Sequence, residues 1–349
     1  MSESIKSRHC IYPGSYALDR PIFDVLNAVA ANRGNCSRFY LDTVESMSNA
    51  GIHIHDQEHH QGLARSHTLS DGSVTWFLSH AETDDQGSIS WYRYAGPLDS
   101  EHILETNPLT VAAKKQLLFL DEHHPSDICF LPDVNHLDAG YLFVTEEFDM
   151  HRLSIYRWDP STGLVLHGYL PQGFPDQGPQ FVFIDRVDDS YYLGVASEHW
   201  GWVALFTATC AELFPKCAKG ELNIDAFQPT CPGGMFPFPS LGGPSQIKLV
   251  RDSTAQWYLL AFRADPNDDP HGDDYVDVYQ VRFNPFMISS KLASIHVSFP
   301  HGDTGFANTG THLVEESGRL LLSSSYRWAK DEGPDNSGYV SRVDECPAA

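Results

Sequence analysis

"GPQFVFIDRVDDSYYLGVAS" at residues 178–197 and "GPSQIKLVRDSTAQWYLLAF" at residues 243–262 share one layout. Each begins with Gly-Pro, continues as an apolar run, turns at Asp and small polar residues, and ends in a second run rich in aromatic and branched side chains. Two such runs joined by a short polar turn predict a β-hairpin. The layout therefore indicates a repeating β-structure.

Five such repeats follow one another along the chain. Their second strands are "VTWFLSHAE", "GYLFVTEEF", "SYYLGVASE", "QWYLLAFRAD" and "RLLLSSSYRW". The equivalent positions, which lie 50 to 66 residues apart, are Phe77, Leu142, Tyr192, Tyr258 and Leu320. A third strand follows each hairpin. Self-similarity at this period without helical patterning predicts an all-β fold, a five-bladed β-propeller.

We expect one β-propeller domain over residues 1–349. Its segments are 1–58 (N-terminal helix and closing strand), 59–110 (blade one), 121–172 (blade two), 177–241 (blade three with a Pro/Gly/Cys-rich insertion), 242–300 (blade four) and 301–346 (blade five). Fourth strands are predicted in blades one, two and four, at residues 102–109, 163–170 and 291–299. Blade five has no fourth strand of its own.

The N-terminal segment supplies the missing strand. Residues 38–46, "RFYLDTVES", alternate and are rich in β-formers, so we expect them to close the ring as the outer strand of blade five. Residues 23–34, "FDVLNAVAANRG", predict a short helix that ends at Gly34 and packs outside the ring.

Charge and hydropathy restrict the partners. The formal net charge of −23 disfavours binding to nucleic acid or to an anionic membrane. No stretch approaches the roughly 18 apolar residues that a membrane-spanning helix needs. The first residues lack the pattern of a signal peptide, which favours the cytoplasm. We expect a small-molecule ligand as the partner.

The insertion between blades three and four, residues 210–243, contains Cys210, Cys217 and Cys231. These cysteines form either one local disulfide or free thiols. A loop of this length in a compact domain is usually functional or disordered, and we expect this one to cover one face of the ring.

Paired histidines precede two inner strands. His60 and His124 are the second members of "HHQGL" (59–63) and "HHPSDI" (123–128), at equivalent places on neighbouring blades. Four polar residues are expected at one ring position just inside the channel, namely Asp127, Gln180, Gln246 and His312. Converging polar groups of this kind suggest a ligand site. Alternatively, they satisfy backbone groups at the strand ends.

These histidines are also candidate metal ligands. His60, His124 and His312 could offer three imidazoles to Zn²⁺ or Fe(II), with Asp127 or Glu198 as a carboxylate. The ligands are dispersed and form no motif of known metal spacing. A site without metal or other cofactor is the alternative.

Three further side chains are candidates. In "SEHWGW" (197–202), Glu198 could act as a general acid or base beside Trp200, which could form a wall over the ligand. The alternative for Trp200 is packing between blades. Arg65 could face an anionic group of the substrate or pair with a neighbouring carboxylate.

The two opening stretches resemble the blade pattern of five-bladed glycosidases of the arabinanase and β-xylosidase type, over the first two strands of blades two to five. The resemblance implies an Asp base on blade one, a second Asp on blade two and a Glu acid on a later blade. "HHQGL" and "GGPSQ" carry no acid at the matching places, and only Asp127 matches. Ordinary glycoside hydrolysis needs two carboxylates. The resemblance therefore carries over the fold and not the activity.

The sequence favours an enzyme that transforms a small molecule, of hydrolase, lyase or isomerase type. His60 and His124 are the expected acid/base groups or metal ligands, Asp127 orients an imidazole, and the remaining polar residues of the channel position the substrate. The alternative is a non-catalytic propeller that binds a ligand or a carbohydrate.

Overall fold

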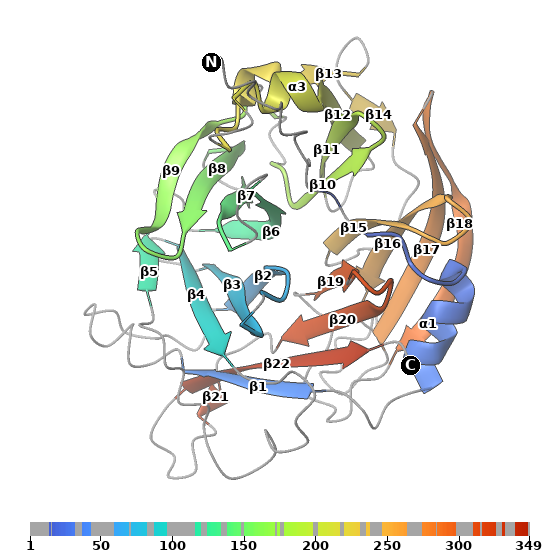
Figure 1. The fold of residues 1–349 in the computed structure, drawn as a ribbon, viewed down its shortest axis with the longest axis horizontal. Coiled ribbons are helices and arrows are strands. Elements are labelled where there is room, and N and C mark those ends of the chain that lie inside the picture. Colours follow the sequence, from blue (N-terminus) through green and yellow to red (C-terminus); the bar gives the residue numbers. More distant parts are fainter. Residues whose placement is uncertain are drawn as a thin grey trace, which may run out of the picture.

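The computed structural model shows five β-sheets arranged as a ring around a central axis (Figure 1). It describes residues 14, 16–31, 37–42, 59–69, 71–81, 87–95, 116–119, 124–133, 138–147, 150–171, 173–174, 178–197, 202–216, 220–230, 235–237, 246–263, 274–283, 285–297, 310–314, 316–325, 330–331 and 339–347. The predicted five-bladed β-propeller is confirmed.

Blades one and two are antiparallel sheets of four strands. Blade one consists of β2 (His59–Arg65), β3 (Ser73–Ala81), β4 (Ser88–Ala95) and β5 (Gln116–Phe119). Blade two consists of β6 (Pro125–Pro132), β7 (Gly140–Glu146), β8 (Arg152–Asp159) and β9 (Gly163–Tyr169). The fourth strand of blade one is β5 and not the predicted segment 102–109, which lies outside the described residues.

Blades three and four follow the same plan. Blade three consists of β10 (Phe181–Val187), β11 (Ser190–Ala196) and β12 (Trp202–Thr209), and two short strands pair with β12, β13 (Gln228–Pro229) and β14 (Met235–Pro237). Blade four consists of β15 (Gln246–Arg251), β16 (Trp257–Arg263), β17 (Asp274–Phe283) and β18 (Phe286–Val297). The insertion thus supplies the outer strands of blade three.

Blade five is closed by the N-terminal strand, as predicted. It consists of β19 (Gly310–Val314), β20 (Leu320–Ser325), β21 (Lys330–Asp331) and β22 (Tyr339–Pro347), and β1 (Ser37–Asp42) pairs antiparallel with β22. Figure 1 shows β1 on the outer edge of this blade. Pairing the two ends of the chain in one sheet covers an edge that would otherwise be open.

The predicted N-terminal helix is confirmed as α1 (Ile22–Ala31). Its apolar face, which includes Ile22, Val25 and Leu26, is buried against blades four and five, outside the ring (Figure 1). Pro21 precedes the helix, where its fixed φ angle suits a helix start. The predicted stop at Gly34 lies outside the described residues.

The hydrophobic core lies between neighbouring blades. One cluster joins blades one and two, a second joins blades two and three, and a third joins blades three and four. The inner strands are buried on both faces, so β10 and β15 appear in the sequence as nearly continuous apolar runs. No helix of the described residues is long and apolar enough to cross a membrane.

The insertion folds back onto blades two and three. Its short helices are α3 (Cys210–Leu213), which begins with a capping box at Thr209, and the 3-10 helix η3 (Ile224–Ala226). Cys210 is buried and free, so it takes no part in a local disulfide, whereas Cys346 is disulfide-bonded. Cys217 and Cys231 lie outside the described residues.

Tyr141 attaches the insertion to blade two. Its buried hydroxyl donates to the Gly220 carbonyl at 2.8 Å and accepts from the Leu222 N–H at 2.8 Å and from Arg157 Nη1 at 2.9 Å. Gly220 has a φ of +59°, and a Cβ there would collide with the Asp133 carboxylate. Glycine is therefore required where the loop meets the blade.

We expect Tyr141→Phe to lower the free energy of unfolding by about 1–3 kcal/mol, because the substitution leaves a buried backbone N–H without its acceptor. Urea unfolding followed by tryptophan fluorescence measures this difference. Tyr169→Phe is the matched control, because Tyr169 is 39% exposed and the substitution keeps its ring. The free energy of unfolding of this variant should be within about 0.5 kcal/mol of the wild-type value. Equal effects of the two substitutions would contradict the attachment through Tyr141.

Candidate functional site

One opening of the axis is formed by the beginnings of the inner strands. β2 and β6 both contain a β-bulge there, with register shifts between His60 and Gly62 and between Pro125 and Ile128. A bulge redirects side chains and is common beside functional sites. The two bulges place Gln61 on β2 and Ser126 on β6 close to His124, which directly precedes β6.

Five side chains form a hydrogen-bonded group at this opening, which we call the His124 cluster: Gln61, His124, Ser126, Glu147 and Gln180. His124 Nδ1 lies 3.2 Å from Glu147 Oε2, and His124 Nε2 lies 3.1 Å from Gln61 Nε2. Ser126 Oγ donates to Glu147 Oε2 at 2.8 Å, and Gln180 Nε2 donates to the other carboxylate oxygen. The carboxylate therefore holds the cluster together.

Glu147 stays ionised in this setting. Burial raises the pKa of its carboxyl group, but the hydrogen bond and charge of His124, with the donors Ser126 and Gln180, outweigh burial and hold the pKa below its ordinary value. An ionised carboxylate only accepts hydrogen bonds, so His124 Nδ1 carries the proton. In the neutral form of the ring, His124 Nε2 presents a lone pair that accepts from the Gln61 amide, whose nitrogen can only donate.

Gln180 contributes an acceptor that is not used. Its side-chain oxygen is buried, and no described residue donates to it. Gly178, two residues earlier, has a φ of +53°, and a Cβ there would collide with the carbonyl oxygen of Glu147. This close approach of the two segments requires glycine and brings Gln180 up to the carboxylate.

Deeper along the axis, Asp127 and Lys248 form a buried ion pair. Lys248 Nζ lies 2.8 Å from both carboxylate oxygens and donates to the carbonyls of Ile128 and Val182 at 3.1 and 3.2 Å. The backbone N–H groups of Ile128 and Val182 donate to the carboxylate at 2.8 and 3.0 Å. Burial raises the pKa of Asp127 to about 6, although Lys248 acts in the opposite direction.

This pair changes the role expected for Asp127. We expected its carboxylate to orient an imidazole, whereas the structure places it on Lys248 and on the backbone of blades two and three. The carboxylate that meets an imidazole is that of Glu147.

The other polar residues of the expected ring do not gather in one place. Gln246 is fully buried and donates from Nε2 to the Gln61 carbonyl at 2.8 Å, so it fixes the backbone of a residue that belongs to the His124 cluster. His312 and Arg65 line a separate cavity, together with Lys248. Arg65 stacks on Trp76, 5.2 Å from the ring centre. The sequence placed these polar side chains at one opening, and the structure divides the described ones between the His124 cluster, the ion pair and the separate cavity.

Three candidates cannot be assigned a place in the site. Glu198 and Trp200 lie outside the described residues, and of His60 the structure describes only the backbone, opposite His80 in β3. Within the described part of the chain, no group of three or more His, Cys, Asp or Glu side chains could hold a metal ion. The metal site stays a prediction.

Sequence reasoning missed Glu147 and Lys248. The hairpin register pairs Pro125 with Glu146, and this register brings His124 opposite Glu147, so a pairing of the two predicted strands could have found the contact. Lys248 is the single charged residue within the apolar run "QIKLV" of β15. A charge in a strand buried on both faces signals a partner, because buried charges are normally paired.

Comparison with known proteins found similarity in structure but none in sequence. No family model and no curated protein sequence matches the chain. An α-L-arabinofuranosidase from Podospora anserina is similar in structure with 12% identity and a TM-score of 0.46, over 85% of this chain and 95% of that one. The catalytic domain of an α-L-arabinofuranosidase from Coprinopsis cinerea has 11% identity and a TM-score of 0.47, over 82% of this chain and 91% of that one. A GH43_1 enzyme from Xanthomonas citri has 10% identity and a TM-score of 0.42, over 93% of this chain and 92% of that one. These likenesses concern the fold alone.

Proposed function

We propose that this protein is a hydrolase that acts on a small molecule at the axial opening, with His124 as the general base. The observation that carries the proposal is the contact of His124 Nδ1 with the buried carboxylate of Glu147, which leaves Nε2 as a proton acceptor. An imidazole oriented by a carboxylate on one nitrogen is the arrangement used by many enzymes to remove a proton at the other nitrogen.

The cluster can orient a water molecule. Water that enters beside His124 displaces the Gln61 amide from Nε2 and gives one proton to that nitrogen as its oxygen bonds to the substrate. The protonated imidazole then returns this proton to the leaving group as the scissile bond breaks. The second hydrogen of the water needs an acceptor, and the unused oxygen of Gln180 offers one. His124 is 16% exposed and Glu147 9%, so the base is reachable while its partner is protected from solvent.

The first test is turnover and equilibrium binding measured together on the wild-type protein. Chromogenic esters, glycosides, lactones and amides serve as probes, and the hydrolysis of any substrate is run in ¹⁸O-labelled water. We expect turnover of one class, with one ¹⁸O incorporated per bond cleaved. Turnover without ¹⁸O would indicate a lyase or isomerase, and tight binding without turnover would indicate a ligand-binding propeller. Either result would overturn the hydrolase proposal.

We expect Glu147→Gln to release the imidazole from its single tautomer, because an amide offers a donor as well as an acceptor at that place. Long-range ¹H–¹⁵N correlation spectra report which ring nitrogen of His124 carries the proton. The wild type should show the proton on Nδ1, and the variant a mixture of both tautomers. Glu221→Gln, at a residue that is 56% exposed, is the control, and its spectrum should match the wild type. A single unchanged tautomer in Glu147→Gln would contradict the role of Glu147.

A further inference from the structure

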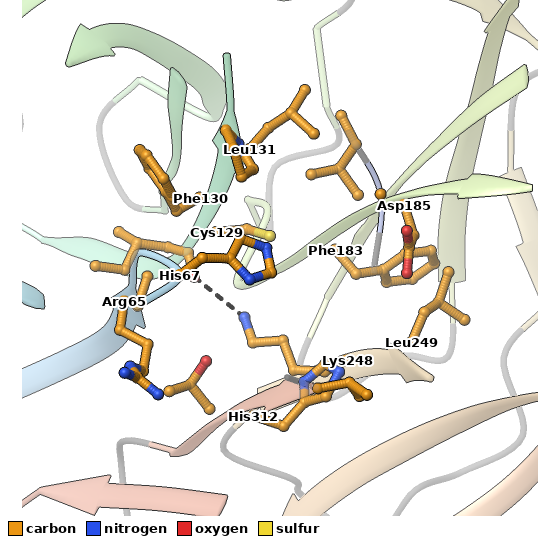
Figure 2. A pocket seen from close by; sticks show the side chains of 17 residues that line it. Arg65, His67, Cys129, Phe130, Leu131, Phe183, Asp185, Lys248, Leu249 and His312 are labelled. Atoms are coloured by element: carbon orange, nitrogen blue, oxygen red, sulfur yellow. Dashed lines mark hydrogen bonds between the residues drawn. The ribbon is translucent and has the colours of Figure 1, made fainter. Parts of the chain in front are cut away.

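Three neighbouring residues at the end of blade three each contain a buried polar atom without a partner. These atoms are Gln180 Oε1, Ser197 Oγ and Trp202 Nε1, and none of them has a hydrogen-bond partner among the described residues. Buried polar groups in proteins are normally satisfied, so three exceptions side by side indicate the place of a ligand atom. The axial cavity of about 80 Å³ in Figure 2 is a different place, because its lining on β10 begins only at Phe183.

Backbone hydrogen bonds within blade three hold these residues side by side. The Ser197 N–H donates to the Trp202 carbonyl at 3.3 Å, which continues the register of β11 and β12 by one residue. The Gln180 N–H donates to the Ala196 carbonyl at 2.9 Å, so Gln180 lies beside the residue that precedes Ser197. Side chains of directly paired residues project from the same face of a sheet. Ser197 and Trp202 therefore share one face of blade three.

This face of blade three packs against blade two, where the proposed base lies. Trp202 packs on the hydrophobic cluster between the two blades, and its ring stacks on Phe174 with ring centres 5.9 Å apart and planes 10° apart. Gln180 donates across the same interface to one oxygen of the Glu147 carboxylate, and the other oxygen contacts His124 Nδ1. The three unpartnered atoms therefore lie on the same side of the opening as the base.

Ser197 and Trp202 can both donate a hydrogen bond. An indole nitrogen is a donor only, and a hydroxyl has one hydrogen to donate. Ser197 is 3% exposed, so its hydroxyl is shielded from competing solvent. Paired donors in a buried place stabilise an oxygen atom on which negative charge develops during acyl transfer. The carbonyl oxygen of an ester develops such a charge when water attacks, whereas glycoside hydrolysis passes through a transition state that resembles an oxocarbenium ion.

We propose that the substrate of the hydrolase is a carboxylic ester, and that Ser197 Oγ and Trp202 Nε1 donate to its carbonyl oxygen. This assignment rests on the proposed function, because it uses the same base. Water gives one proton to His124 Nε2 as its oxygen bonds to the carbonyl carbon, and the π electrons move to the carbonyl oxygen, where the two donors stabilise the charge. The C=O bond then re-forms as the bond to the alcohol oxygen breaks, and His124 returns the proton to that oxygen. The products are a carboxylic acid and an alcohol.

Removal of these donors should leave the fold intact. A structural donor has a protein acceptor that its removal would leave unsatisfied, whereas neither of these donors has one among the described residues. Ser197→Ala should therefore melt at or above the wild-type temperature. Trp202→Phe keeps an aromatic ring against Phe174 and should stay folded, which circular dichroism checks.

The activity test compares esters and glycosides that share one leaving group, 4-nitrophenol. The rate that remains in His124→Asn is subtracted, because activated esters also react with surface nucleophiles. We expect the wild type to hydrolyse an ester and no glycoside. Ser197→Ala and Trp202→Phe should each lower kcat by about 10²–10³-fold and leave KM nearly unchanged, because the lost hydrogen bond is made in the transition state.

Two matched variants serve as controls. Ser324→Ala removes a buried hydroxyl on β20 that also has no partner among the described residues, and Trp257→Phe removes an indole N–H on β16. Neither residue belongs to the site, so both variants should keep the wild-type kcat.

Each contrary outcome has a separate meaning. Turnover of glycosides or amides without any ester would overturn the ester assignment and leave the hydrolase proposal standing, whereas turnover of no probe would overturn both. A wild-type kcat in folded Ser197→Ala and Trp202→Phe would overturn the role of the two donors. An acyl group on Ser197, found by mass spectrometry of the quenched reaction, would make its hydroxyl a nucleophile and would equally overturn that role.

Discussion

Replacing Lys248 with methionine is expected to lower the free energy of unfolding by about 3–5 kcal/mol, because it leaves a buried carboxylate without its counter-charge. Lys248 is 4% exposed and Asp127 1%. The ammonium also donates to the carbonyls of Ile128 and Val182, so its removal breaks contacts among three blades at the axis. Urea unfolding, followed by intrinsic fluorescence, measures the loss.

The deficit of Lys248→Met should depend on pH. Burial already raises the folded-state pKa of Asp127 to about 6, and removing Lys248 takes away the largest influence that opposes burial, so this pKa should rise further. A carboxyl group whose pKa is raised by folding stabilises the fold when protonated, and this contribution is lost as pH rises through the folded pKa. The variant should therefore be closer to the wild type at pH 5 than at pH 8.

The double variant Asp127→Asn/Lys248→Met is the control for this prediction. It removes the unpaired charge and keeps an oxygen that can accept from a backbone N–H, so part of the lost stability should return and the pH dependence should vanish. A single variant Lys248→Met within about 1 kcal/mol of the wild type at pH 8 would show that the carboxylate finds water or another donor.

The ring could be predicted because its evidence is local and repeated. Each hairpin is defined by an apolar run, a polar turn and an aromatic run, and the missing fourth strand of blade five required the N-terminal strand now seen as β1. The outer strand of blade one was misplaced. Short apolar runs occur both at 102–109 and at Gln116–Phe119, and the choice between them is made by pairing with β4, which the sequence does not display.

The division of the polar residues could not be predicted. Inner strands that run in one direction around an axis put their beginnings at one opening, which explains why His124 and Gln180 both contact Glu147. How far each strand is staggered along the axis depends on packing between blades and on the bulges in β2 and β6. The sequence does not show this stagger, so it could not show that His312 lines the separate cavity with Arg65 and Lys248.

The sequence analysis also failed to predict the ion pair between charged residues that are far apart in the chain. Asp127 and Lys248 are 121 residues apart in sequence; Lys248 has an apolar neighbour on each side in its strand, and Asp127 is followed by an apolar run. Their burial could have been anticipated from those neighbours, and a shared site from the need of buried charges for partners. A carboxylate in a buried strand was instead interpreted as a catalytic group, although a structural ion pair perturbs a pKa in the same way.

His124→Asn is expected to reduce kcat/KM for the substrate found in the turnover screen by about 10²–10⁴-fold, the usual contribution of a general base. Asparagine keeps polar atoms near Gln61 and Glu147 but cannot take up a proton. The fold should be retained, because Ser126 and Gln180 still hold the Glu147 carboxylate and His124 precedes β6 and is partly exposed.

The matched control for His124→Asn is His296→Asn. His296 lies on β18, the outer strand of blade four, beside Tyr275, and its substitution should leave kcat/KM within about twofold of the wild type. A merely structural role for His124 would lower the melting temperature and leave the rate of the remaining folded protein intact. A rate in folded His124→Asn within threefold of the wild type would remove His124 as the base. A large loss of rate at an unchanged melting temperature is the result that the geometry of His124, Glu147 and Gln180 requires, because only the proton acceptor has been removed.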